Sequence, residues 1–354
     1  RECSRPPETQ PVFQRYASRL CNTQTRSAQT QPLARPTMDV IVLAGGFGTR
    51  LRPWTESIPK PLLPILDKSM IEHVLDVLPN SQVDRVLIAA GYGVEQMREH
   101  FDKIPLPYEV IIVEETEPLG TGGAIANCRQ YLSDGTFCVI NGDLITGLKV
   151  EEMLEFHKDN GGIATISLWE VEDPSRFGVA DYTQSTGKIM RFQEKPLLEE
   201  AFSNLINAGT YLLEHDIFDF MPEGTHSIER DVYEKIASTG VLNGFPFQGT
   251  FVDAGTPVSF VEASQACISS NRFSSGSVQG DSWFGDGSHS VGEVSGSSIG
   301  PGVTIAEGCN VRNSVILEGA SIGENCVLDS CLVGKGTKLS QGTNLQGEIV
   351  DHQA

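Results

Sequence analysis

Apolar residues alternate along the chain between two spacings that predict strands and helices. Continuous apolar runs predict buried strands at 39–44, 85–90, 110–113, 137–140, 163–168 and 207–213. Apolar residues three or four positions apart predict helices at 69–78, 94–101 and 151–158. Because strands and helices follow one another at this spacing, the pattern predicts an α/β domain with a mostly parallel sheet covered on both faces.

The apolar spacing changes to a repeat beyond residue 298. Ile, Val or Leu returns after steps of six, six and five residues, a repeat of 17, at 299, 305, 311, 316, 322, 328, 333, 339, 345 and 350. This period and the glycines exclude an amphipathic helix. They predict short strands that coil with one inward apolar residue on each of three faces. The repeat resembles the left-handed parallel β-helix of hexapeptide-repeat proteins.

Length and composition divide the chain into four segments. With 354 residues, two folded domains are expected, and we place them at 38–273 and 299–354. Residues 274–298 hold nine Ser and six Gly, which predicts a linker or an irregular first coil. Residues 1–37 hold six Arg, no Lys, two acidic residues and no apolar signal-peptide core. They fit an organelle transit peptide or a non-native extension, and we favour a disordered, non-native extension.

Charge and cysteine content exclude several classes of protein. All apolar runs are far shorter than the ~20 residues of a membrane-spanning helix. A net charge of −20 and a pI near 4.7 argue against binding to nucleic acid or a membrane surface, since both attract basic proteins. The eight cysteines lack metal-site spacing, which predicts free thiols in a reducing compartment, the cytoplasm. Cys309, Cys326 and Cys331 lie beside inward repeat positions and are expected to fill the core.

A glycine-rich loop with cations follows the first predicted strand. The glycines in 45–48 leave backbone N–H groups open to a phosphate or a base. Arg50, Arg52 and Lys60 follow in one short stretch of an otherwise acidic protein, and Lys60 stands between two prolines. Neither the GxGxxG nor the GxxxxGKS/T pattern fits, so the loop predicts a phosphate site of another kind.

The stretches GG-x-GTRLRP-x-T and PKPLLPI resemble the signature of NDP-sugar pyrophosphorylases, and this resemblance extends to about Ala263. It implies a Rossmann-like, mixed but mostly parallel sheet, with the β-helix as a common appendage of the family. By the same match Arg50 and Lys60 bind phosphates and, with Asp143, carry the catalysis. The implied nucleotide-binding residues are Leu43, Ala44, Gly45, Gly46, Gly48, Thr49, Arg50, Glu115, Gly120 and Thr121.

Two aspartates and three further residues complete the implied site. Asp143 and Asp253 each end a predicted strand, and two carboxylates plus substrate phosphates suit Mg²⁺. The pair matches the family's GD and D-x-G-x-P metal motifs. The resemblance further implies that Glu194 and Asn207 bind sugar hydroxyls and that Lys195 holds the sugar phosphate.

The implied substrates are a nucleoside triphosphate and a sugar-1-phosphate. Guanine presents two adjacent hydrogen-bond donors, which suits the acceptor-only carboxylate of Glu115, whereas relatives that use uracil or thymine commonly carry Gln there. The stretches SIER at 227–230 and FVDAGTP at 251–257 also look most like those of mannose-1-phosphate guanylyltransferases. GTP and mannose-1-phosphate are therefore favoured. The alternatives are UTP or dTTP with glucose-1-phosphate, and GTP with a heptose-1-phosphate.

Two other classes of function remain to be weighed. A catalytically inactive, nucleotide-sugar-binding subunit would be expected to lose a metal aspartate or Lys60, and this chain retains them. An acyltransferase site in the β-helix is disfavoured because the histidines there are only His289, before the repeat, and His352, at its end. We expect instead that the β-helix joins subunits of a homo-oligomer, because its open end leaves strand edges unpaired.

Overall fold

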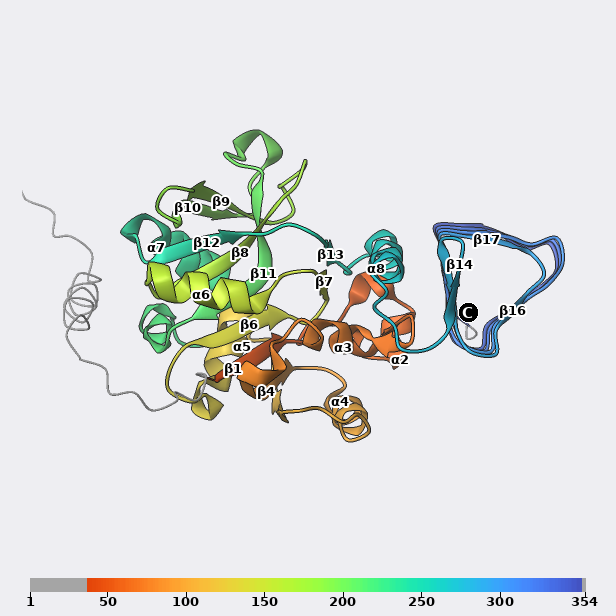
Figure 1. Cartoon of the computed structure of the whole chain (residues 1–354), viewed down its shortest axis with the longest axis horizontal. Helices are drawn as coiled ribbons and strands as arrows, with labels where there is room; N and C mark the ends of the chain where they lie inside the picture. Colours follow the sequence, from red (N-terminus) through yellow and green to blue (C-terminus); the bar gives the residue numbers. More distant parts are fainter. Residues whose placement is uncertain (1–36, 352–354) are drawn as a thin grey trace, which may run out of the picture.

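The structure is a computed structural model that describes residues 37–351. The predicted extension 1–37 therefore lies, except for Thr37, outside the described residues, as do residues 352–354. Figure 1 shows an α/β domain on one side, a three-faced β-helix on the other, and helix α8 (Pro257–Ser269) between them.

A nine-stranded sheet forms the centre of the α/β domain, in the order β5-β4-β1-β6-β11-β8-β12-β10-β9. Its strands are β1 (Met38–Leu43), β4 (Val83–Ala90), β5 (Glu109–Glu114), β6 (Phe137–Asn141), β8 (Ala164–Glu170), β9 (Gly178–Thr183), β10 (Lys188–Glu194), β11 (Leu205–Leu213) and β12 (Leu242–Pro246). Strands β4, β1 and β6 are parallel, whereas β11 runs antiparallel to both β6 and β8. The predicted α/β fold with a mixed, mostly parallel sheet is confirmed.

Helices cover both faces of this sheet because successive side chains of its strands point to opposite sides. On β1, Ile41 lies in the core beneath α5, whereas Val40 and Val42 lie in the core beneath α3 and α6. The helices are α2 (Trp54–Ser57), α3 (Met70–Leu75), α4 (Val94–Phe101), α5 (Gly120–Cys128), α6 (Val150–Asn160), α7 (Glu234–Ile236) and α8. Within 37–351, no helix combines the length and apolar character needed to cross a membrane.

Short helical turns and two small hairpins complete the α/β domain. The turns are η1 (Thr49–Leu51), η2 (Lys60–Leu62), η3 (Asn80–Gln82), η4 (Arg129–Tyr131), η5 (Leu198–Glu200), η6 (His215–Phe220), the π-helical η7 (Glu229–Tyr233) and η8 (Ala237–Thr239). Strand β2 (Pro64–Ile65) pairs with β3 (Lys68–Ser69), and β7 (Leu144–Thr146) pairs with β13 (Phe251–Asp253).

The tail forms the predicted β-helix, with strands stacked in three sheets that are parallel except for the first strand, β14, which pairs antiparallel with β15. One sheet has the order β14-β15-β18-β21-β24-β27, the second β16-β19-β22-β25 and the third β17-β20-β23-β26. Their bounds are β14 (Ser277–Gln279), β15 (Ser282–Phe284), β16 (His289–Ser290), β17 (Glu293–Ser295), β18 (Ser298–Ile299), β19 (Thr304–Ile305), β20 (Asn310–Arg312), β21 (Val315–Ile316), β22 (Ser321–Ile322), β23 (Val327–Asp329), β24 (Leu332–Val333), β25 (Lys338–Leu339), β26 (Asn344–Gln346) and β27 (Ile349–Val350).

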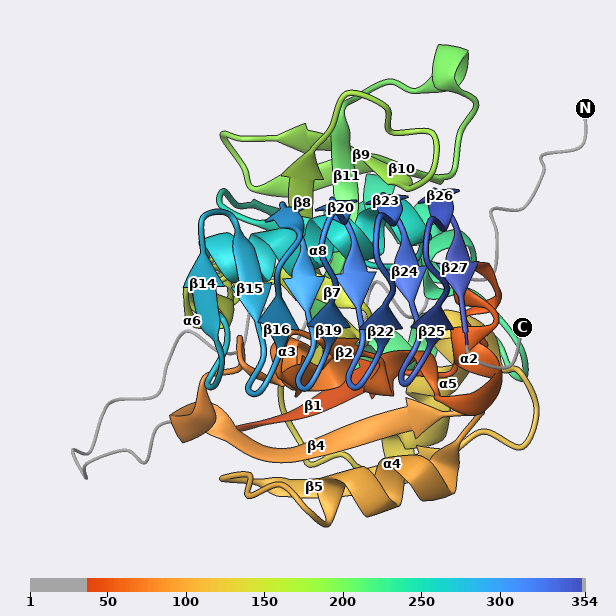
Figure 2. The same ribbon diagram turned by 90° about the vertical axis from the view of Figure 1, so that its right-hand side faces the viewer.

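The register of these strands matches the repeat in the sequence. Ile299 lies opposite Ile316, and Ile316 opposite Val333, so each predicted inward position stacks on the next. Figure 2 shows the strands of successive coils side by side, from β14 at one end to β27 at the other. Segment 274–298 holds β14 to β17 and joins this stack, with Trp283 opposite Ser298.

A third apolar core joins the β-helix to the loop that carries the predicted phosphate-binding residues. Leu51 and Trp54 of that loop lie in one buried cluster with side chains of α8 and with Val315, Leu317 and Leu332 of the β-helix. The indole Nε1 of Trp54 donates a hydrogen bond to the Val350 carbonyl at 3.3 Å. Its ring packs edge-on against Phe260 of α8, with 5.8 Å between centroids. The β-helix therefore packs against the segment after β1 and stabilises its position.

Replacement of Trp54 by Ala should destabilise the protein by about 3–5 kcal/mol, because a fully buried aromatic side chain would leave a cavity at this junction. Urea unfolding followed by circular dichroism measures the effect. As a control, Val258→Ala on α8, where the side chain is 65% exposed, should change the free energy of unfolding by less than about 0.5 kcal/mol. Equal losses in the two variants would contradict the role given to Trp54.

Candidate functional site

The glycine-rich loop after β1 is held in one shape by close contacts. Gly48 has a φ of 62°, in the left-handed region that favours glycine, and its carbonyl accepts a hydrogen bond from Thr55 Oγ1 at 2.9 Å. A Cβ on Gly45 would lie only 2.8 Å from Glu115 Oε1, so a larger residue would collide with that carboxylate. The loop therefore brings its backbone close to Glu115 at one end and to Lys60 at the other.

The two predicted metal aspartates lie side by side, Asp143 in the turn just before β7 and Asp253 as the last residue of β13. Asp253 stands opposite Leu144 in the β7–β13 pair, and Ala254 N donates to the Asp143 carbonyl at 3.0 Å. The Asp143 carboxylate pairs with Lys60 Nζ. By contrast, Oδ1 of Asp253 is buried without a hydrogen-bond partner among the described residues. Burial and the neighbouring Asp143 raise the pKa of Asp253, against the opposing effect of nearby cations.

Two of the three cations of the glycine-rich stretch, Arg50 and Lys60, converge on the same point. Arg52 does not line the cavity there, and its exposed side chain lies 3.9 Å from Glu56 Oε1. A Cβ placed on Gly255 would lie 2.9 Å from Asp253 Oδ1, 3.0 Å from Arg50 Nη2 and 3.4 Å from Lys60 Nζ. Thr256 then caps α8 by accepting from Ser259 N, and Pro257 occupies the first helical turn, so the D-x-G-x-P motif ends in a rigid helix start. A cavity of about 210 Å³ opens here, lined by Leu43, Ala44, Gly46, Gly48, Thr49, Arg50, Lys60, Pro61, Gly142, Asp143 and Gly255.

The donor set at this point suits a hard cation bound together with phosphates. Asp143 and Asp253 offer carboxylate oxygens, one of them without a partner. Among residues 37–351, no group of three or more His, Cys, Asp and Glu side chains is arranged to hold a metal ion by itself. Mg²⁺ usually takes one or two carboxylates and completes its shell with water and substrate phosphates. The two aspartates therefore fit such an ion.

Glu115 lies at the far side of the glycine loop. It is 8% exposed, its N–H donates to the Ala90 carbonyl at 2.9 Å, and its Oε2 accepts from Leu119 N at 3.4 Å. Burial raises the pKa of its carboxyl group, while the bond from Leu119 works against that shift. Thr121, which we predicted to bind the nucleotide, lies in the first turn of α5, and its hydroxyl donates a hydrogen bond to Glu229 Oε2 at 2.6 Å.

The three predicted sugar-side residues lie along the next strands of the sheet. Lys195 Nζ lies 3.2 Å from Glu194 Oε1, just after β10. Asn207 on β11 donates from Nδ2 to Tyr211 Oη at 2.9 Å. Strand β11 pairs antiparallel with β6, and Gly209 packs closely against Asn141, the last residue of β6. A Cβ on Gly209 would lie only 2.6 Å from Asn141 Nδ2. Asn207 and the aspartates thus lie at the same edge of the sheet.

Two further residues join these parts and were not predicted from the sequence. Arg176 lies close enough to Asp253 to lower its pKa. It precedes Phe177, whose carbonyl accepts from Lys195 N at 2.9 Å, so it connects the sugar side to the aspartates. Glu229 contacts Thr121 and Tyr211. Arg176 lies outside every stretch singled out in the sequence. Glu229 belongs to the stretch SIER at 227–230, but the resemblance of that stretch indicated a substrate and gave Glu229 no place in the site.

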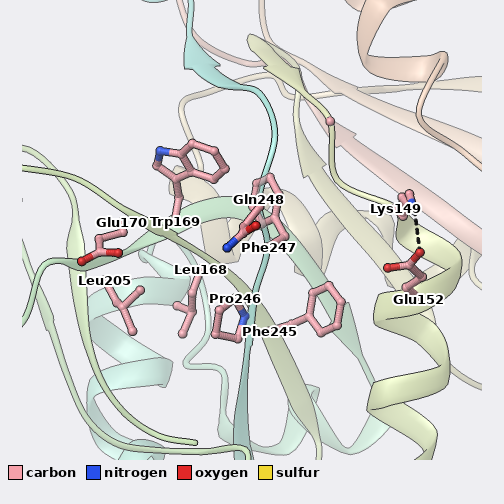
Figure 3. A pocket seen from close by; sticks show the side chains of 11 residues that line it. Lys149, Glu152, Leu168, Trp169, Glu170, Leu205, Phe245, Pro246, Phe247 and Gln248 are labelled. Carbon is pink, nitrogen blue, oxygen red and sulfur yellow. Dashed lines mark hydrogen bonds and ion pairs between the residues drawn. The ribbon is translucent and has the colours of Figure 1, made fainter.

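A separate cavity of about 640 Å³ lies at the ends of β8 and β12 (Figure 3). Trp169 and Phe247 pack there with 5.0 Å between ring centroids, and Lys149 pairs with Glu152 at 2.8 Å. None of the predicted site residues lines this cavity. The smaller cavity beside Asp143 is therefore the one that brings the predicted chemistry together.

Comparison with known proteins identifies the family of the chain. Residues 39–270 match the family model "Nucleotidyl transferase", and residues 290–352 match "GMPPB C-terminal domain". The chain is 35% identical to mannose-1-phosphate guanylyltransferase 1 of Arabidopsis thaliana over 333 residues, 88% of this chain and 90% of that protein. It is 31% identical to the mannose-1-phosphate guanylyltransferase catalytic subunit beta of Xenopus tropicalis over 335 residues, again 88% and 90%.

A solved structure is also similar. HddC from Yersinia pseudotuberculosis, complexed with GMP-PN, shares 32% identity at a TM-score of 0.55, covering 65% of this chain and 99% of that one.

In the absence of divalent cations, Asp143→Asn and Asp253→Asn should change the stability of the protein in opposite directions. Asp143→Asn removes the partner of the buried Lys60 and should lower the free energy of unfolding by about 1–3 kcal/mol. Asp253→Asn removes a buried carboxylate that faces Asp143, and should raise the thermal midpoint. With GTP present, addition of MgCl₂ should raise the midpoint of the wild type further and that of neither variant, because the two carboxylates bind the ion together with phosphates. A full Mg²⁺ response in Asp253→Asn would contradict a metal site at this pair.

Proposed function

Because this chain belongs to the nucleotidyl transferase family and is a sugar-1-phosphate nucleotidyltransferase of the NDP-sugar pyrophosphorylase type, we propose that it converts GTP and mannose-1-phosphate into GDP-mannose and pyrophosphate. The observation that carries the choice of GTP is the buried carboxylate of Glu115 beside Gly45. A carboxylate accepts from two adjacent donors, and guanine offers N1–H and N2–H in that arrangement. The names of the relatives support the choice of mannose-1-phosphate.

The reaction is an in-line transfer at the α-phosphorus of the nucleotide. An oxygen of the sugar-1-phosphate attacks that phosphorus, the bond to the bridging oxygen breaks, and pyrophosphate leaves with the electron pair. The attacking oxygen is already ionised near neutral pH, so no general base is needed. The protein contributes by positioning two anions and neutralising their charge, and we assign this to Arg50, Lys60 and Lys195.

The two aspartates would hold Mg²⁺, as the unpartnered oxygen of Asp253 and the adjacent Asp143 support. When bound, the ion supplies charge neutralisation for the triphosphate. Lys60 already pairs with Asp143, so its ammonium group lies ready to contact a phosphate at the same place. We place the nucleotide along 43–50 and at Gly120 and Thr121.

The sugar phosphate belongs to the opposite half of the site in this proposal. Glu194 accepts hydrogen bonds from sugar hydroxyls, and Asn207 donates one from its Nδ2. Lys195, with its side chain 56% exposed, binds the phosphate. Arg176 is a third cation near Asp253, after Lys60 and Arg50. Two anionic substrates thus meet between cations that come from separate turns and loops of the chain.

We also propose that the β-helix, placed at 299–354 after a catalytic domain of 38–273, joins copies of this chain. Strands β25, β26 and β27 end their sheets and have edges without a neighbour among the described residues. The six described cysteines are free, which supports a reducing compartment such as the cytoplasm.

A substrate panel tests the proposed function. Purified protein with MgCl₂ is incubated with GTP, UTP, dTTP, ATP and CTP, each with mannose-, glucose- and a heptose-1-phosphate, and pyrophosphate release is measured. GTP with mannose-1-phosphate should give the highest kcat/KM. Faster turnover of UTP or dTTP would overturn the guanine assignment, and binding without turnover of any pair would favour an inactive subunit.

Glu115→Gln tests the base assignment separately. An amide can accept only one of the two guanine bonds, so kcat/KM for GTP should fall about tenfold, while use of UTP should change less than about twofold.

The wild-type KM for GTP should also rise as the pH falls from about 8 toward about 5, because the raised pKa of Glu115 lets it take up a proton above the ordinary glutamate value of about 4.3. This rise should be absent in Glu115→Gln. The same pH profile in both proteins would count against the assignment.

A further inference from the structure

Glu229 is a buried carboxylate between the two substrate halves. It opens η7, which packs against α5 and β10, and only 9% of it is exposed. Three hydroxyl groups surround its two oxygens. Thr121 Oγ1 and Ser227 Oγ each donate to Oε2 at 2.6 Å, and Tyr211 Oη donates to Oε1 at 3.4 Å.

An ionised carboxylate accepts hydrogen bonds and cannot donate them, so the three hydroxyl protons must all point toward Glu229. The Tyr211 oxygen then keeps its lone pairs, and one of them accepts from Asn207 Nδ2 at 2.9 Å. Oδ1 of Asn207 accepts from Gly209 N at 2.9 Å. The amide of Asn207 is therefore fixed in one orientation, with its second Nδ2 hydrogen left for another acceptor.

The same carboxylate fixes the start of α5. With its proton directed to Glu229, the Thr121 oxygen accepts from Ile228 N at 3.0 Å. This bond ties the first turn of α5 to the segment before η7. The negative charge of Glu229 also contributes to the raised pKa of Glu194, after the larger effect of burial.

We propose that Glu229 is a positioning residue that orders both halves of the active site at once. It directs the hydroxyl of Thr121 on the nucleotide side and, through Tyr211, the amide of Asn207 on the sugar side. A sugar hydroxyl then accepts from the free Nδ2 hydrogen of Asn207. This inference rests on the proposed roles of Thr121 and Asn207.

Glu229→Gln tests the proposal because it keeps the size of the side chain and replaces one acceptor oxygen by an NH₂ group. At least one of the three hydroxyls must then turn around or lose its acceptor. We expect the KM for the sugar-1-phosphate to rise about tenfold and the KM for the nucleotide about threefold, with kcat falling less than either. Both KM values are measured for the substrate pair that the wild type uses best.

Tyr211→Phe separates the sugar side from the nucleotide side. It keeps the buried ring and removes the one hydroxyl that bonds both Glu229 and Asn207, while Thr121 keeps its bond to Glu229. It should raise the KM for the sugar-1-phosphate and leave the KM for the nucleotide unchanged. In the double variant with Glu229→Gln, the sugar effects should not multiply, because both changes break the same chain of hydrogen bonds. Multiplying effects would overturn the proposal.

Ser227→Ala is the matched control. It removes the third hydroxyl from Glu229 without touching the residues assigned to either substrate, so both KM values should stay within about twofold of the wild type. If Glu229→Gln resembles this control, Glu229 has only a structural role. If Glu229→Gln does not fold, Tyr211→Phe decides, and an unchanged sugar KM there would refute the proposal. If the proposed substrates are wrong, the wild type itself will turn over another substrate pair faster, and the comparison of the variants is then made with that pair.

Discussion

The pairing of β7 with β13 is the constraint on which the rest of the site depends. It joins the segment after β6 to one that the chain reaches only after β12, and so sets Asp143 and Asp253 side by side. Two carboxylates this close repel, and burial adds a desolvation cost. Lys60 and Arg50 offset part of that cost from the glycine loop. The two aspartates and the two cations therefore lie together in one site, where the cations can also attract anionic substrates.

Local charge governs this site although the whole chain carries a net charge of −20. At physiological ionic strength, exposed charges more than about 8 Å away are largely screened. Arg50 and Lys60 line the cavity themselves, and Lys60 is only 8% exposed, so dissolved salt screens its charge less than the charges of the exposed surface. Phosphate binding and overall acidity are therefore compatible in one protein.

The sequence predicted those features that depend on neighbouring residues or on a regular period. The strands 39–44 and 137–140 were placed to within a residue or two at each end, and the stacking of Ile299 on Ile316 follows from the repeat. The resemblance placed Asp143 and Asp253 in one site, where the structure has them adjacent. The antiparallel direction of β11 and the position of Arg176 depend on contacts between distant segments, and no local pattern encodes them. Glu229 lies in the stretch SIER that the sequence singled out, but its bonds to Thr121 and Tyr211 join segments far apart in the chain.

The contact of Trp54 with the last coil makes the tail part of the catalytic scaffold. Trimming the chain to a minimal enzyme after α8 would uncover a row of apolar side chains and free the arginine-bearing loop in the same step. The number of coils is also constrained, since the coil that ends in β27 is the one that reaches the indole. A chimera between two relatives should therefore take the tail and residues 51–54 from the same parent, so that the contacts between them are kept.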